Sequence, residues 1–120
     1  MSYILLVDDN DDLMENLKLI LEMEGYPVKA VSSSVDALQV IDQGIPSLIL
    51  ADVVMAGVNG YDLCQQVKMN TDCAEVPFIF LSALTTPDDI DRGRNLGADD
   101  YVTKPFAIQD LLAVIHRYLG

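Results

Sequence analysis

Two apolar segments of the chain end directly in acid, Ile4-Leu5-Leu6-Val7-Asp8-Asp9 and Leu48-Ile49-Leu50-Ala51-Asp52. Continuous apolar runs of four residues, bounded by polar residues, are typical of strands that a parallel sheet buries on both faces. Ligands of such sheets gather at the carboxyl ends of the strands. The three acids that end these segments are therefore candidates for one shared site.

Strand and helix patterns alternate along the rest of the chain. We expect strands near residues 3–8, 28–31, 48–52, 78–82 and 101–103, with helical periodicity between them. Ser33 is expected to cap a helix, Pro87 to open one, and Gly25 and Gly97 to end two others. Five such alternations predict an α/β fold with a doubly wound, five-stranded parallel sheet. If the strand order is 2-1-3-4-5, Asp8 and Asp9 come to lie beside Asp52.

Length and composition narrow the class of protein. A chain of 120 residues fits one domain, residues 1–120. Nineteen acids against seven bases give a net charge of −12, which argues against nucleic-acid binding by this domain and favours a basic or apolar partner. We find no apolar run of bilayer length and no leader before the first strand, so we expect a cytoplasmic protein without a membrane partner. Cys64 and Cys73 lack CxxC spacing and are expected to be free thiols.

The strand ends supply a consistent set of chemical groups. Three carboxylates crowded together repel one another unless a cation lies among them, and oxygen ligands suggest Mg²⁺ or Mn²⁺. The fourth expected strand ends at Ser82, which offers a hydroxyl, and the fifth leads into Lys104, which offers an ammonium group. An acid cluster, a hydroxyl and a cation at adjacent strand ends are what a site needs to hold a transferred phosphoryl group.

The motifs in combination resemble the receiver domain of bacterial two-component response regulators, in particular the chemotaxis regulators. The resemblance covers essentially the whole chain. It rests on four motifs, which are Asp8-Asp9-Asn10, Asp52 followed by Met55-Ala56-Gly57-Val58-Asn59-Gly60, Ser82-Ala83, and Gly97-Ala98-Asp99-Asp100-Tyr101-Val102-Thr103-Lys104-Pro105-Phe106. The family has the flavodoxin-like strand order 2-1-3-4-5, which the resemblance therefore implies here.

The resemblance also implies a phosphorelay function. Asp52 would accept a phosphoryl group from a phosphohistidine on a sensor histidine kinase or a histidine phosphotransfer protein. Asp9 and Asp52 would ligate Mg²⁺ directly, Asp8 mainly through water, and Val54 through its backbone carbonyl. The domain would be a signalling phosphoprotein and not an enzyme, although it would assist its own phosphorylation and dephosphorylation.

Other residues acquire expected roles from the same resemblance. Ser82 and Lys104 would each bind a phosphoryl oxygen, and Tyr101 would change rotamer on activation. The peptide bond before Pro105 would be cis. The surface formed by the fourth helix, the fifth strand and the fifth helix would bind an unidentified output partner. A carboxylate nucleophile needs no general base, so no histidine is required in the site, and His116 is expected at the surface.

The loop after Asp52 departs from the family pattern. Met55-Ala56-Gly57 lacks the usual proline, which predicts a slightly more mobile loop. Val54 and Leu84 are apolar where some relatives have groups that orient an attacking water. We therefore expect slow self-dephosphorylation.

Two other interpretations of these acids, as parts of other kinds of protein, fit the sequence less well. A phosphatase of the haloacid dehalogenase type needs an acid two residues after its nucleophile, but Asp52 is followed by Val53-Val54. A flavodoxin would bind phosphate in its first loop, where the acids at 8–12 would repel it. The remaining alternative is a pseudo-receiver, an interaction module that keeps the fold without being phosphorylated.

Overall fold

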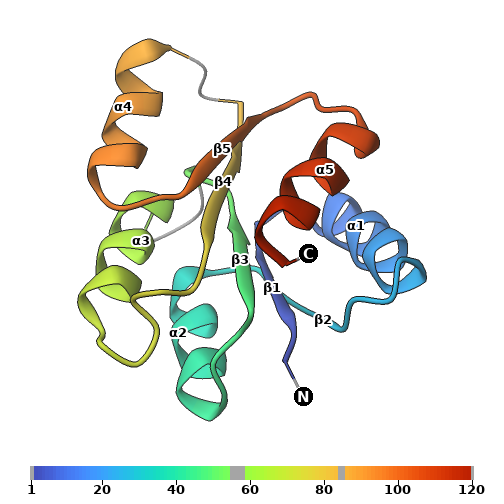
Figure 1. Cartoon of the computed structure of the whole chain (residues 1–120), viewed down its shortest axis with the longest axis horizontal. Helices are drawn as coiled ribbons and strands as arrows, with labels where there is room; N and C mark the ends of the chain where they lie inside the picture. Colours follow the sequence, from blue (N-terminus) through green and yellow to red (C-terminus); the bar gives the residue numbers. More distant parts are fainter. Residues whose placement is uncertain (1, 55–58, 84–85, 120) are drawn as a thin grey trace.

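The computed structural model describes residues 2–54, 59–83 and 86–119 and shows a sheet between two layers of helices (Figure 1). The strands are β1 (Ile4–Val7), β2 (Val28–Val31), β3 (Leu48–Ala51), β4 (Phe78–Ser82) and β5 (Asp100–Thr103). The helices are α1 (Asp11–Met23), α2 (Ser34–Gln43), α3 (Gly60–Met69), α4 (Pro87–Asn95) and α5 (Ile108–Leu119).

All strands pair in parallel in the order β2-β1-β3-β4-β5, which confirms the predicted fold class. Val7 lies opposite Ala51, so β1 and β3 end at the same level of the sheet. The backbone N–H of Asp52 donates to the carbonyl of Val7 at 2.9 Å. This register places Asp8 and Asp52, the residues that follow the two strands, at the same edge.

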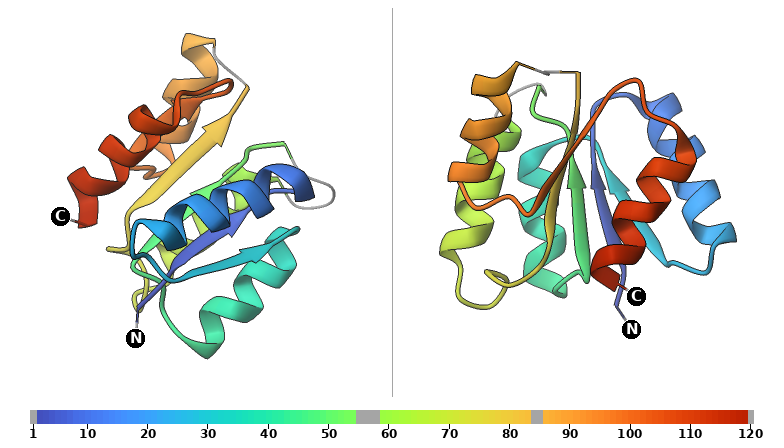
Figure 2. Two further views of the ribbon diagram at one scale, coloured as in Figure 1. Left: turned by 90° about the vertical axis from the view of Figure 1, so that its right-hand side faces the viewer. Right: turned by 45° about the horizontal axis from the view of Figure 1, so that its top comes forward.

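Alternate strand residues supply the two hydrophobic clusters of the core. One cluster includes Leu5, Ile49 and Phe80 with residues of α2 and α3, and the other includes Leu6, Leu50 and Ile79 with residues of α1 and α5. Figures 1 and 2 show the corresponding layers, with α2, α3 and α4 on one face of the sheet and α1 and α5 on the other. Burial on both faces explains why β1, β3 and β4 are apolar without alternation.

Short polar side chains fix where the helices begin. The side chains of Asn10, Ser33, Asn59 and Thr86 accept a hydrogen bond from a backbone N–H in the first turn of α1, α2, α3 and α4, respectively. Pro87 follows Thr86 at the first position of α4. Gly25 and Gly97 have φ values of 94° and 103° just after α1 and α4, a conformation that favours glycine. The expected helix boundaries are therefore confirmed.

Gly60 joins α3 to the end of β3. Its N–H donates to the carbonyl of Val53 at 2.8 Å. A Cβ atom at this position would lie 2.0 Å from the carbonyl oxygen of Asp52, far inside van der Waals contact. A side chain here would force α3 away from Asp52, so glycine is required by close approach of two backbone segments.

We predict that Gly60→Ala destabilises the protein by roughly 1–3 kcal/mol, because the added methyl group collides with rigid backbone. Gly44→Ala is the matched control, since a Cβ there meets no atom within 4 Å and the φ of 172° is ordinary extended backbone. It should change the free energy of unfolding by less than about 1 kcal/mol. Urea denaturation measures both values, and equal stability of the two variants would contradict the assigned contact.

Candidate functional site

The ammonium group of Lys104 lies between the carboxylates of Asp8 and Asp52. Its Nζ is 2.7 Å from Oδ2 of Asp8 and 3.1 Å from Oδ2 of Asp52. The three side chains are largely shielded from solvent, with 20 % exposure for Lys104, 8 % for Asp8 and 13 % for Asp52. Residues from the ends of β1, β3 and β5 thus meet in one ion-pair cluster.

Local backbone orients each of these two carboxylates. Oδ1 of Asp8 accepts a hydrogen bond from the N–H of Asn10 at 3.0 Å, and Oδ1 of Asp52 accepts one from the N–H of Val54 at 3.2 Å. Each hydrogen bond closes a short turn in which an aspartate side chain accepts from the backbone N–H two residues further on. Each acid therefore keeps Oδ2 directed at the shared cation.

Lys104 is held at the site by the neighbouring strand. Its backbone N–H donates to the carbonyl of Ser82 at 2.8 Å, which aligns the ends of β4 and β5. The Lys104–Pro105 peptide bond is cis. Burial by itself would lower the pKa of Lys104, but the hydrogen bonds and charges of Asp8 and Asp52 outweigh it, so the pKa is raised. The lysine is therefore cationic throughout the physiological range.

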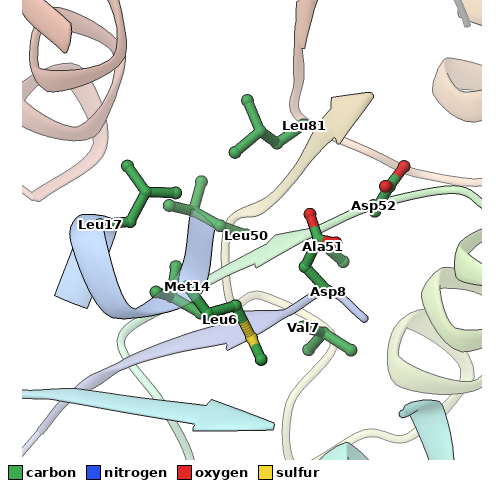
Figure 3. A pocket seen from close by; sticks show the side chains of 9 residues that line it. All are labelled: Leu6, Val7, Asp8, Met14, Leu17, Leu50, Ala51, Asp52 and Leu81. Atoms are coloured by element: carbon green, nitrogen blue, oxygen red, sulfur yellow. The ribbon is translucent and has the colours of Figure 1, made fainter. Parts of the chain in front are cut away.

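Apolar side chains surround one side of Asp8 and Asp52. Figure 3 shows a small cavity that Asp8 and Asp52 line together with Leu6, Leu50 and Leu81. Two side chains of α1, Met14 and Leu17, complete its apolar part. Such surroundings strengthen the electrostatic interactions of the charged groups, because few polar atoms screen them.

The donor set fits a hard divalent cation. Asp8 and Asp52 offer carboxylate oxygens, and one ammonium group already contacts both, so they are close enough to share a cation. Two acids against one lysine leave the cluster negative. Asp9, the third predicted acid, is exposed, and the described residues include no group of three acid, histidine or cysteine side chains already arranged around a metal position. Asp9 would therefore have to turn toward the pair to ligate the ion.

Ser82 ends β4, and its side chain interacts with that of Tyr101 on the neighbouring strand β5. Ser82 is buried, and Tyr101 is half-buried with its ring centroid 5.8 Å from that of Phe80. Burial raises the pKa of Tyr101, whereas a side-chain hydrogen bond with Ser82 lowers it. The structure thus connects the predicted phosphoryl-binding hydroxyl to the predicted switch residue.

Other candidate residues lie away from the ion-pair cluster or outside the described residues. His116 is exposed on α5, as predicted. Cys64 and Cys73 are free and buried, and burial raises the pKa of Cys64 to about 11, which makes it a poor nucleophile. Val54 is exposed. Residues 55–58 and Leu84, on which the expected loop mobility and part of the expected slow dephosphorylation rest, lie outside the described residues.

Comparisons with known proteins agree on one family. A family model described as "Response regulator receiver domain" matches residues 4–116. Response regulator SaeR of Staphylococcus aureus strain USA300 is 36% identical over 119 residues, which cover 99% of this chain and 51% of that protein. The chain therefore spans about half the length of this relative.

Solved structures agree with the sequence comparison. A putative response regulator from Chloroflexus aurantiacus J-10-fl is 33% identical with a TM-score of 0.91, covering 99% of this chain and 98% of that one. The signal receiver domain of a signal transduction histidine kinase from Syntrophus aciditrophicus is 36% identical with a TM-score of 0.91, covering 99% and 90%. Among the described residues, no helix is long and apolar enough to cross a membrane.

We predict that Lys104→Met destabilises the protein by roughly 1–3 kcal/mol at neutral pH, because two shielded carboxylates lose their shared cation. The pKa of Lys104 is raised above its ordinary value of 10.5, so its contribution is complete below that pH and is lost as the pH rises through the folded-state pKa. The stability difference between the wild type and the variant should therefore shrink above about pH 10.5.

Thermal denaturation from pH 7 to 11.5 measures this difference. The matched control is Lys18→Met, because Lys18 is exposed on α1, and it should stay within about 0.5 kcal/mol of the wild type. A difference that grows with pH would contradict the ion-pair assignment.

Proposed function

Because the chain belongs to the family of response regulator receiver domains, we propose that Asp52 accepts a phosphoryl group from a phosphohistidine on a partner protein. The observation that carries the proposal is the contact of Asp52 and Asp8 with Lys104 at the carboxyl end of the sheet. An Asp52 oxygen would attack phosphorus, the P–N bond would break, and the histidine nitrogen would leave with the bonding electron pair.

The neighbours of Asp52 match the needs of this transfer. A carboxylate is ionised at neutral pH, so the nucleophile needs charge neutralisation and alignment and no general base. Lys104 is already at hydrogen-bonding distance from Asp52 and would move onto a phosphoryl oxygen. Ser82 would exchange its bond with Tyr101 for one to a second phosphoryl oxygen. These two groups would bind negative charge that the incoming phosphate brings.

A bound Mg²⁺, or Mn²⁺ in its place, would neutralise phosphoryl oxygens that Lys104 does not reach. Asp9 and Asp52 would hold it directly, Asp8 mainly through water, and Val54 through its backbone carbonyl. Carboxylate and carbonyl oxygens are the ligands these ions prefer. The negative charge that remains around Lys104 supports this assignment.

The proposed partners follow from the family. Residues 1–120 would act as one receiver domain of a two-component system, with a sensor histidine kinase or a histidine phosphotransfer protein as donor. The surface of α4, β5 and α5 would bind the output partner. The domain would assist its own phosphorylation and dephosphorylation without being a free-standing enzyme. The apolar, exposed side chain of Val54 cannot orient a water, which favours a long-lived phosphoryl group.

We predict that acetyl phosphate with Mg²⁺ adds one phosphoryl mass to the intact chain, and that Asp52→Asn gains none. Asp72→Asn is the matched control, because Asp72 is an exposed aspartate in the turn after α3, and it should label like the wild type. Intact mass spectrometry makes the measurement. Absence of labelling in the wild type, under conditions that phosphorylate a known receiver, would favour the pseudo-receiver alternative instead.

We also predict that Mg²⁺ stabilises the unphosphorylated protein by mass action. At ten times its Kd, the ion should add about 1.4 kcal/mol, or roughly 4–8 °C in Tm. Asp9→Ala should lose most of this shift and should not be phosphorylated. Asp12→Ala, which removes an exposed acid from the first turn of α1, should keep both properties. Equal Mg²⁺ shifts in the two variants would show that Asp9 is not a ligand.

A further inference from the structure

Helix α4 packs on the sheet through a small interface. Five of its nine residues are charged, and Gly93 is its one buried residue, in a helix that the structure describes completely. The helix therefore gains little from burial of apolar side chains. Its position depends on a few specific contacts.

Tyr61 of α3 makes two of these contacts. Its side chain is buried, and its hydroxyl donates to the backbone carbonyl of Asp89 at 3.0 Å. The guanidinium carbon of Arg92 lies 4.4 Å from the centre of the Tyr61 ring, in a cation–π contact. The side chain of Tyr61 thus contacts both a backbone carbonyl and a cationic side chain of α4.

Gly93 brings α4 against two further aromatic rings. A Cβ atom on Gly93 would lie 3.0 Å from the ring of Phe80 and 3.5 Å from that of Tyr101, so the glycine allows close approach. The ring of Phe80 is 5.4 Å from Tyr61 and 5.8 Å from Tyr101, measured between centroids. These three rings, which we call the aromatic cluster, join α3, β4 and β5 beneath α4. Figure 1 shows α4 on this side of the sheet.

Hydroxyl groups link the aromatic cluster to the site. Burial and the nearby Asp89 raise the pKa of Tyr61, while Arg92 and a side-chain hydrogen bond with Tyr101 lower it. Tyr101 in turn has a side-chain hydrogen bond with Ser82. The polar contacts therefore continue from Ser82 through Tyr101 and Tyr61 to the backbone of α4.

We propose that Tyr61 is the positioning residue that couples the phosphoryl site to α4, through its hydroxyl on the Asp89 carbonyl and its ring beneath Arg92. The proposal rests on the proposed function, in which Ser82 leaves Tyr101 to bind the phosphoryl group. Tyr101 and Tyr61 then repack together around Phe80. Because α4 is held by Tyr61, the helix follows, and one of two arrangements becomes favoured.

The first test is made on the unphosphorylated protein, so it does not depend on phosphotransfer. In Tyr61→Phe the ring and its cation–π contact remain, and the hydrogen bond to Asp89 is lost. Amide hydrogen exchange in residues 87–95 should accelerate roughly two- to tenfold, the effect of one hydrogen bond on local opening. Exchange at wild-type rates would overturn the proposal.

Tyr3→Phe is the matched control. Tyr3 is also buried, and its hydroxyl donates to a backbone carbonyl, that of Gly44, at the end of α2. Its loss should accelerate exchange near Gly44 and leave α4 unchanged. Acceleration in α4 to the same extent in both variants would show general destabilisation and would overturn the coupling role.

The second test measures whether a change at Asp52 reaches α4. Beryllofluoride with Mg²⁺ on Asp52 stands in for the phosphoryl group, and amide chemical shifts report the response. In the wild type, shifts should change around Asp52, Ser82 and Tyr101 and in α4. In Tyr61→Phe the changes around Asp52 should persist, while those in residues 87–95 should fall to less than about half. Equal changes in α4 for both proteins would overturn the proposal, whereas absence of any response at Asp52 in the wild type would contradict the proposed function itself.

Discussion

The contact of one ammonium group with two carboxylates holds the functional end of the molecule together. Lys104 binds the acids that end β1 and β3, and its own strand is aligned by Ser82. Two acids with one lysine leave an excess of negative charge in shielded surroundings, where charges interact more strongly than in water. The pair therefore binds its lysine firmly and keeps a negative charge that would favour a further cation. The same lysine is the group that an incoming phosphoryl oxygen would compete for.

Much of this arrangement could be predicted from the sequence, because strand ends determine it. The apolar segments before Asp8 and Asp52 identify two interior strands, and the order of the sheet brings their ends together. The sequence did not show that the structure would bring Asp8 but not Asp9 to Lys104. Adjacent side chains leave the backbone in different directions, so one of two neighbouring acids can reach the lysine while the other points to solvent. Asp9 is accordingly exposed.

Tyr61 and Gly60 show where sequence reasoning reached its limit. Tyr61 is buried and its hydroxyl donates to the carbonyl of Asp89, and no sequence pattern indicates which carbonyl that hydroxyl reaches. Asn59 and Gly60 belong to the family motif. That the backbone of Gly60 lies close to the carbonyl of Asp52 is known only from the structure. Periodicity predicts which residues face the core. It does not predict distances between segments that meet from different parts of the chain.

The site also has a consequence for how the chain becomes competent during synthesis. Asp8 and Lys104 are separated by 96 positions, so Asp8 gains its ion-pair partner only after the segment that follows β5 has been made. Loop closure over most of the chain must precede this contact. A nascent chain that has built β1 to β4 would still lack Lys104, the shared ion-pair partner of Asp8 and Asp52. The ion-pair cluster would therefore form only when the last strand of the sheet is in place, at the completion of this fold.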